Sequence, residues 1–199
     1  SRAGARGMKE GRGRDMNPQV FREYDVRGVV DRDLDRDFVE RFALAVGYYW
    51  RERGVARVSL GRDARLSSPL FGEILKEGLA SSGIDVFDLG MVPTPVMYFS
   101  LFRLDLGGGI QITGSHNPAD NNGFKIALGR STIYGKDILE LRSVMERGSR
   151  ATGAGKVEAI DIMPEYLDDV VLRIGPCRRS LRVIVDPGNG VGGHPAMEE

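Results

Sequence analysis

The chain has 199 residues, 41% hydrophobic and 28% charged, which is typical of a soluble globular protein with one core and part of another. Basic and acidic residues both number 28, so the net charge is zero and general nucleic-acid binding is disfavoured. The single cysteine, Cys177, excludes an intrachain disulfide and fits a reducing compartment. No apolar run reaches the roughly 20 residues of a bilayer span, so membrane insertion is excluded too.

The first 15 residues are rich in glycine and arginine and lack the apolar centre of a secretory signal. We therefore expect residues 1–15 to be a disordered leader and the protein to be cytoplasmic. The sequence favours no particular oligomeric state.

From residue 16 onward, helical and strand-like patterns alternate. Asp35 or Asp37 can cap a helix that runs to about Arg53, and a β-rich stretch over 55–60 follows. Ser67 or Ser68 can cap a second helix with Pro69 in its first turn. The residues expected on its buried face are Leu70, Ile74, Leu75 and Leu79.

The pattern continues with a strand over 84–89, and Pro93 or Pro95 begins a helix to about Leu104. A strand around Ile110, a strand and a turn over 124–134 and a helix over 137–147 follow. Strands that alternate with helices predict an α/β domain, a layered sheet with helices on both faces, spanning residues 16–150.

A small, polar stretch over 148–155 marks the expected domain boundary. Beyond it we expect a helix over 164–174 and a core strand over 181–185 that leads into a glycine-rich turn. The residues expected to be buried on that helix are Tyr166, Leu167, Val170 and Val171. Residues 151–199 are therefore interpreted as a linker and the truncated start of a second, incomplete α/β domain.

The most informative segment is Gly109 to Pro118, with the sequence Gly-Ile-Gln-Ile-Thr-Gly-Ser-His-Asn-Pro. Ile110 and Ile112 alternate with polar neighbours, the pattern of a strand that ends at a sheet edge. A tight turn then presents the Ser115 hydroxyl beside His116, and the small residues leave room for an anion. The sequence Asn-Gly-Phe-Lys, ending at Lys125, brings a cation within reach.

This combination resembles the α-D-phosphohexomutases, the phosphomannomutase/phosphoglucomutase family. Four further blocks resemble family motifs in family order: residues 24–28, Tyr-Asp-Val-Arg-Gly; 61–65, Gly-Arg-Asp-Ala-Arg; 90–95, Gly-Met-Val-Pro-Thr-Pro; and 186–192, Asp-Pro-Gly-Asn-Gly-Val-Gly. The resemblance implies intramolecular phosphoryl transfer between the 1- and 6-positions of hexose phosphates, through a phosphoserine and a hexose 1,6-bisphosphate intermediate.

The resemblance makes Ser115 the phosphoryl-accepting nucleophile. The transferring group needs cations against its oxygens, and Arg27 and Lys125 are the candidates. His116 can orient the substrate or shuttle a proton, because an unperturbed histidine titrates near neutrality. A hydrogen bond that stabilises the loop is an equal alternative for His116. The candidate substrate- and phosphate-binding residues are Tyr24, Arg62, Arg65 and Asn117. For each of the candidate cations, Lys125 and Arg65 included, a surface salt bridge is the alternative.

The family resemblance also implies Mg²⁺, bound by the phosphoserine at Ser115 and by a cluster of aspartates in the second domain. The chain contains no such cluster, so a metal site within it is incomplete. We therefore expect a mutase fragment that is inactive alone. The alternatives are a non-catalytic module that binds anions or phosphosugars, and a phosphomonoesterase with a serine nucleophile.

Overall fold

The computed structural model describes residues 16–175 and 179–193. Its elements, in chain order, are η1 (Pro18–Val20), β1 (Val26–Val29), α1 (Arg36–Arg51), β2 (Arg57–Arg62), α2 (Ser68–Ser81), β3 (Asp85–Met91), α3 (Thr94–Arg103), β4 (Gly108–Ile112), β5 (Asn121–Leu128), β6 (Ser131–Thr132), α4 (Lys136–Glu146), β7 (Val157–Ala159) and α5 (Met163–Ile174).

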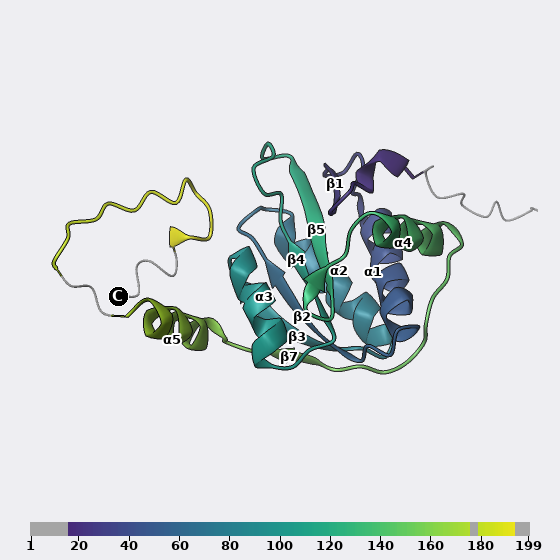
Figure 1. Cartoon of the computed structure of the whole chain (residues 1–199). Coiled ribbons are helices and arrows are strands. Elements are labelled where there is room, and N and C mark those ends of the chain that lie inside the picture. Colours follow the sequence, from purple (N-terminus) through teal and green to yellow (C-terminus); the bar gives the residue numbers. More distant parts are fainter. Residues whose placement is uncertain (1–15, 176–178, 194–199) are drawn as a thin grey trace, which may run out of the picture.

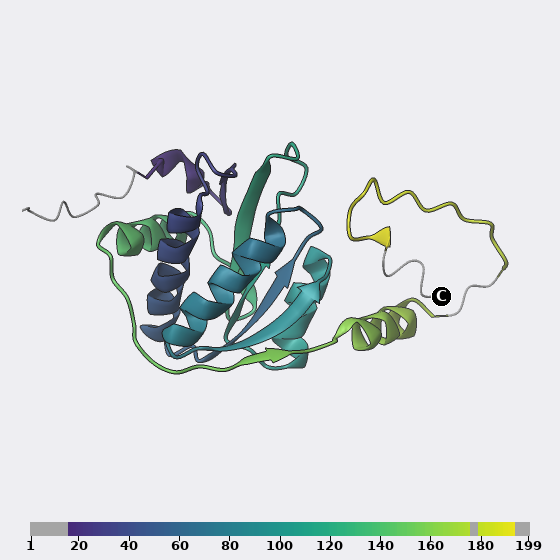
Figure 2. The same cartoon turned by 180° about the vertical axis from the view of Figure 1, so that it is seen from behind.

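The strands form one seven-stranded mixed sheet in the order β1-β5-β4-β2-β3-β7, with β6 paired to β5. The pairs β4–β2, β2–β3 and β3–β7 are parallel, whereas β5 is antiparallel to both β4 and β1. Helices α1, α2 and α4 cover one face, and α3 covers the other (Figures 1 and 2). The predicted α/β sheet with helices on both faces is confirmed.

Aromatic packing fixes the orientation of β5, the strand that follows the loop carrying Ser115. The ring of Phe124 stacks on Phe42 of α1 at 4.5 Å between centroids and lies 5.8 Å from Phe71 of α2. All three rings are buried, and burying a side chain of this size stabilises a fold by about 1.5–3 kcal/mol. Because side chains alternate along a strand, burial of Phe124 under α1 and α2 turns Lys125 to the opposite face.

The helix beginnings follow the predicted capping pattern only in part. The Asp35 carboxylate accepts a hydrogen bond from the backbone N–H of Phe38 at 2.9 Å, which confirms Asp35 as the cap of α1. Ser67 precedes α2, but its side chain makes no capping hydrogen bond. The predicted burial of Ile74, Leu75 and Leu79 is confirmed, but that of Leu70 is wrong: Leu70 is exposed, and Phe71 fills the core in its place.

Two predictions for the C-terminal part are wrong. Residues 181–185 form no strand; Val183 and Ile184 are 72% and 96% exposed, because no neighbouring strand pairs with them in the part of the chain that the structure describes. The predicted buried face of α5 is also wrong in part: Val171 is 54% exposed and Met163 is the one fully buried residue, whereas Tyr166 and Leu167 are half-buried against the core around α3. Tyr166 makes an edge contact with Phe99 of α3, at 5.4 Å between ring centroids, and remains half-buried.

Past the predicted boundary, the chain still adds to the same sheet. Strand β7 pairs in parallel with β3, and Ile162 and Met163 are buried against α3 residues such as Met97. The predicted leader and Cys177 lie outside the described residues. Within the described ranges, no helix is both long and apolar enough to cross a membrane.

Candidate functional site: the Ser115 loop

The loop after β4 presents Ser115, as the sequence predicts. Ser115 is exposed and adopts φ +52°, a left-handed conformation that residues with a side chain rarely take. Its backbone N–H donates to the Thr113 hydroxyl at 3.0 Å, a local turn that holds this conformation. The Ser115 hydroxyl lies 3.4 Å from Nδ1 of His116, at the long end of hydrogen-bond distances.

Charged side chains hold both ends of the Gly114 residue. Its N–H donates to Oδ2 of Asp63 at 3.0 Å, and its carbonyl oxygen accepts from Nη1 of Arg27 at 2.5 Å. The same carbonyl accepts two hydrogen bonds from Asn117, from its backbone N–H at 3.1 Å and from its side-chain amide at 3.0 Å. The residue before the serine is therefore fixed by hydrogen bonds with β1, with the residue that follows β2 and with the loop itself.

Asp25, Arg27 and Lys125 form a charged cluster on the α3 face of the sheet. Oδ2 of Asp25 accepts from Nε and Nη2 of Arg27 at 3.1 and 2.6 Å and lies 3.9 Å from Nζ of Lys125. Arg27 is 4% exposed, and such a buried guanidinium requires a carboxylate partner. The structure thus brings the two predicted catalytic cations to one carboxylate and brings Arg27 into contact with the Ser115 loop.

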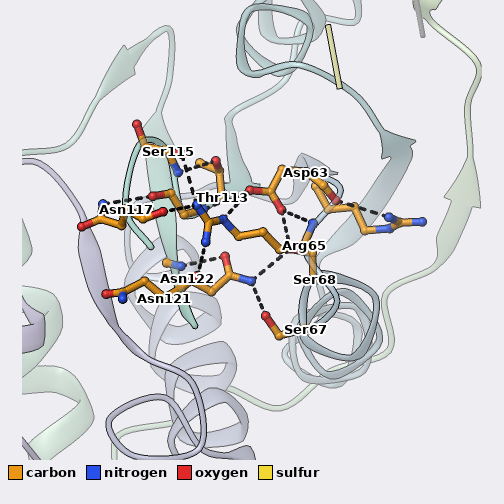
Figure 3. A network of polar contacts seen from close by, with 12 residues as sticks. Asp63, Arg65, Ser67, Ser68, Thr113, Ser115, Asn117, Asn121 and Asn122 are labelled. Atoms are coloured by element: carbon orange, nitrogen blue, oxygen red, sulfur yellow. Dashed lines mark hydrogen bonds and ion pairs between the residues drawn. The ribbon is translucent and has the colours of Figure 1, made fainter. Parts of the chain in front are cut away.

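Arg65 lies behind the loop and bonds to its backbone (Figure 3). Its Nη1 donates to the carbonyl oxygens of Pro118 and Asn121 at 2.6 and 2.8 Å, and its Nη2 donates to those of Ser115 and Asn117 at 3.2 and 2.7 Å. Its Nε lies 3.4 Å from Oδ2 of Asp63. The guanidinium therefore contacts four carbonyl groups of one loop.

A second layer of polar side chains ties this loop to α2. Oδ1 of Asp63 accepts from the Ser68 hydroxyl at 2.6 Å and from the backbone N–H of Arg65 at 3.0 Å. The buried side-chain amide of Asn122 donates to the hydroxyls of Ser67 and Ser68 at 2.8 and 3.0 Å (Figure 3). Hydrogen bonds consequently join the beginning of α2 to the beginning of β5, where the loop that carries Ser115 ends.

The structure does not bring Arg62 to the same cluster. In the sheet, Arg62 of β2 pairs with Ile112 of β4, and Lys125 of β5 pairs with Gln111 of β4. Because Gln111 and Ile112 are consecutive and side chains alternate along a strand, Arg62 and Lys125 lie on opposite faces of the sheet. Arg62 packs over Gly72 of α2 and lines a separate cavity of about 120 Å³. Its guanidinium makes a long hydrogen bond, 3.4 Å, to the carbonyl of Asp63.

Tyr24 precedes Asp25 and is 63% exposed, with its ring 6.3 Å from that of Tyr134 between centroids. The sequence-predicted contact of Tyr24 with a phosphosugar stays a prediction. The same holds for a phosphate contact of Asn117, whose side-chain amide turns back to the Gly114 carbonyl.

Ser115 faces a cavity of about 930 Å³. Its lining includes Asp63, Arg65, Ser115, His116 and Asn117, together with Gly188, Asn189, Gly190 and Val191 from the C-terminal segment. A space of this size exceeds what a monosaccharide phosphate needs. No group of three or more His, Cys, Asp or Glu side chains that could hold a metal ion occurs among the described residues.

Three residues that the sequence prediction had not assigned are central to the site: Asp25, Asp63 and Asn122. Asp25 and Asp63 each stand two residues before an arginine that they contact, Arg27 and Arg65. That repeated Asp-X-Arg spacing in two of the quoted motifs is the signal that could have found them.

This fold and site define an α/β domain that presents an exposed serine hydroxyl, with a histidine and cations nearby, at the end of a central strand. The family model described as phosphoglucomutase/phosphomannomutase, alpha/beta/alpha domain I, matches residues 18–149. The chain belongs to the phosphoglucomutase/phosphomannomutase family, and residues 18–149 are its α/β/α domain I.

Curated relatives agree. The chain is 42% identical over 176 residues to a phosphoglucomutase of Neisseria gonorrhoeae, and the match covers 87% of this chain and 38% of that protein. It is 41% identical over 178 residues to the phosphomannomutase/phosphoglucomutase of Pseudomonas aeruginosa, covering 87% of this chain and 37% of that protein. The chain thus spans less than two fifths of the length of these two relatives.

A solved structure of a phosphoglucomutase/phosphomannomutase family protein from Burkholderia thailandensis superposes with a TM-score of 0.85 at 38% identity. The match covers 91% of this chain and 41% of that one. A putative phosphomannomutase from Thermus thermophilus gives a TM-score of 0.69 at 28% identity, over 76% of this chain and 35% of that one.

Proposed function

We propose that this chain supplies the phosphoserine domain of a phosphohexomutase that acts on mannose or glucose phosphates. Ser115 accepts a phosphoryl group from a hexose 1,6-bisphosphate and returns it to a hexose monophosphate. The observation that carries the proposal is the Ser115 hydroxyl itself, exposed at the end of a central strand, beside His116 and above a Gly114 that Asp63 and Arg27 hold. A preorganised nucleophile of this kind is what phosphoryl transfer requires.

In the forward step, Oγ of Ser115 forms a bond to phosphorus while the bond from phosphorus to the sugar oxygen breaks. The serine proton passes to Nδ1 of His116 or to solvent, and the departing sugar oxygen takes up a proton to become a hydroxyl. Arg27 and Lys125 stabilise the negative charge on the transferring group. The 3.9 Å approach of Lys125 to Asp25, which also binds Arg27, supports joint action of the two cations.

Mg²⁺ is part of the proposal for the whole enzyme, where it would offset the charge of the phosphoserine. The described residues do not form a magnesium site by themselves, because they contain no group of three or more candidate ligands. A single phosphoserine holds an octahedral ion weakly. The remaining ligands would have to come from outside the described residues.

The proposal is tested by incubating the protein with glucose 1,6-bisphosphate or mannose 1,6-bisphosphate and mapping phosphopeptides by mass spectrometry. We expect a gain of about 80 Da at Ser115. Ser115→Ala should abolish it. Label that persists at wild-type level in Ser115→Ala would overturn the assignment, and reversible binding of the bisphosphate without any label would favour a non-catalytic binding module.

A further inference from the structure

All five N–H donors of the Arg65 guanidinium face acceptors within the protein. Nη1 and Nη2 each carry two hydrogens and face two carbonyl oxygens, those of Pro118 and Asn121 and those of Ser115 and Asn117. The fifth donor, Nε, faces the Asp63 carboxylate at 3.4 Å. A substrate phosphate could reach this guanidinium only by displacing contacts that hold the loop.

We infer that Arg65 is a positioning residue for Ser115 and does not bind the sugar phosphate. This inference rests on the proposed role of Ser115 as the nucleophile. Arg65 acts through the loop backbone: it gathers the carbonyl groups of residues 115–121 on one side and so fixes the course of the chain through the serine. The planar fork of an arginine can hold four carbonyl groups, whereas the ammonium group of a lysine has three donors on one atom.

The direction of the carbonyl groups determines where the amide groups point. In a trans peptide the C=O and the following N–H point in opposite directions. Because the Ser115 carbonyl turns toward Arg65, the N–H of His116 points away from it. The described residues provide no acceptor for this N–H, whereas the N–H groups of Ser115 and Asn117 are taken by Thr113 and Gly114. The His116 amide is therefore the one N–H among these three consecutive residues that has no acceptor in the described part of the chain.

Gly114 supplies a second, independent observation. A Cβ atom built on Gly114 would lie 2.0 Å from Nε and 2.1 Å from Cζ of Arg65. The guanidinium thus packs directly against the Gly114 backbone, in space that any side chain at this position would occupy. Gly114 and Arg65 are matched to each other, and a substitution at one should change the effect of a substitution at the other.

The first experiment measures hydrogen exchange of the unphosphorylated protein, so it does not depend on the proposed chemistry. In Arg65→Gln, amides of residues 114–121 should exchange at least about tenfold faster than in the wild type, while α1 and β2 remain protected, because one strong contact carries roughly 1.4 kcal/mol. Arg142→Lys, at a partly exposed arginine of α4 that pairs with Glu146, is the control. Unchanged loop exchange in Arg65→Gln would overturn the inference.

The second experiment separates positioning from phosphate binding. Labelling of Ser115 is followed against glucose 1,6-bisphosphate concentration in the wild type and in Arg65→Lys. A positioning role predicts a maximal rate about tenfold lower or more, with a half-saturating concentration within about threefold of the wild-type value. A raised half-saturating concentration with an unchanged maximal rate would show that Arg65 binds the phosphate and would overturn the inference. If even the wild type takes no label, the proposed function fails. The hydrogen-exchange experiment above and the thermal-unfolding experiment below then still decide the role of Arg65.

The third experiment compares thermal unfolding of Gly114→Ala in the wild type and in an Arg65→Ala background. The alanine methyl group collides with the guanidinium in the first case and enters vacated space in the second. We expect Gly114→Ala to lower Tm clearly in the wild type and to lower it by less than half as much beside Arg65→Ala. Equal reductions in the two backgrounds would contradict the packing that the inference requires.

Discussion

Nη1 of Arg27 donates to the carbonyl oxygen of Gly114 at 2.5 Å, across 87 residues of sequence. This contact joins β1, at one edge of the sheet, to the loop that carries Ser115, the proposed nucleophile. Asp25 holds the other side of the same guanidinium, so a single buried arginine links a carboxylate to the loop backbone. The position of Ser115 therefore depends on Arg27, in a strand that lies two places away from β4 in the sheet.

Arg27→Lys should slow the labelling of Ser115 by about 10- to 100-fold, because lysine retains the charge but cannot bind Asp25 and Gly114 together; each charge-assisted hydrogen bond contributes roughly 1.5–3 kcal/mol. Initial rates of phosphopeptide formation provide the measurement. Arg36→Lys, at an exposed arginine of α1 that pairs with Glu40, is the matched control. Wild-type rates in Arg27→Lys would exclude a role for the bidentate contact.

Lys125→Met should reduce the maximal labelling rate by about 100-fold, because it removes a cation proposed to act on the transferring phosphoryl group. The shape of the side chain is largely retained, so the circular dichroism spectrum should not change. Lys136→Met, at the exposed beginning of α4, serves as the control. A maximal rate within twofold of wild type would remove Lys125 from the proposed mechanism.

The 199-residue chain by itself should show little or no mutase turnover, even if Ser115 accepts a phosphoryl group. Its described residues provide no metal-binding cluster, and loss of preorganised cation contacts typically costs several kcal/mol in the transition state. A coupled assay for conversion of glucose 1-phosphate or mannose 1-phosphate to the 6-phosphate measures this. Turnover within about tenfold of a full-length relative would show that the described site suffices.

Asp33 should make the fold sensitive to acid. Its hydrogen bond with Arg32 is the largest cause that lowers the pKa of its carboxyl to about 2, with further donors from Val29 and Asn17. A carboxyl with a lower pKa in the folded state than in the unfolded state stabilises the fold above the unfolded value of 3.8, and this stability is lost as pH falls toward 2.

Asp33→Asn should consequently lower Tm at pH 7, and its difference from the wild type should shrink between pH 4 and pH 2, because the wild-type carboxyl becomes protonated there. Thermal unfolding followed by circular dichroism across this range is the measurement. A Tm difference that stays constant down to pH 2 would mean that the charge of Asp33 does not stabilise the fold.

The sequence predicted the long elements well, because their patterns are local. Helix α1 begins at its predicted cap, and β4 ends just before the predicted serine turn. It did not predict β1 or β7, because neither strand shows a clear alternation of apolar and polar residues. Strand β1 has four residues, among them Arg27 and Gly28, and β7 has three exposed residues at a sheet edge. The strand expected over 181–185 fails for the opposite reason: its local pattern is strong, but the described structure offers no partner strand.

The sequence predicted those site residues that belong to one local motif. It did not predict the contacts between site residues that are far apart in the sequence. Ser115 and His116 are adjacent in sequence, so their proximity needs no tertiary information. Arg65 was expected to face the substrate, but its contacts with backbone carbonyls more than 50 residues away depend on the complete fold. Arg62 illustrates the same limit, because a strand's two faces cannot be assigned from one motif alone.

Because Ser115 has a left-handed backbone conformation, the residue that would be most stable at this position is not the one that provides a hydroxyl. A glycine would adopt φ +52° without the steric cost that a side chain brings, so Ser115→Gly should give a more stable loop than Ser115→Ala. Yet glycine would remove the hydroxyl that the surrounding hydrogen bonds hold in place. A substitution that stabilises the loop at this position would therefore remove the hydroxyl that the proposed phosphoryl transfer requires.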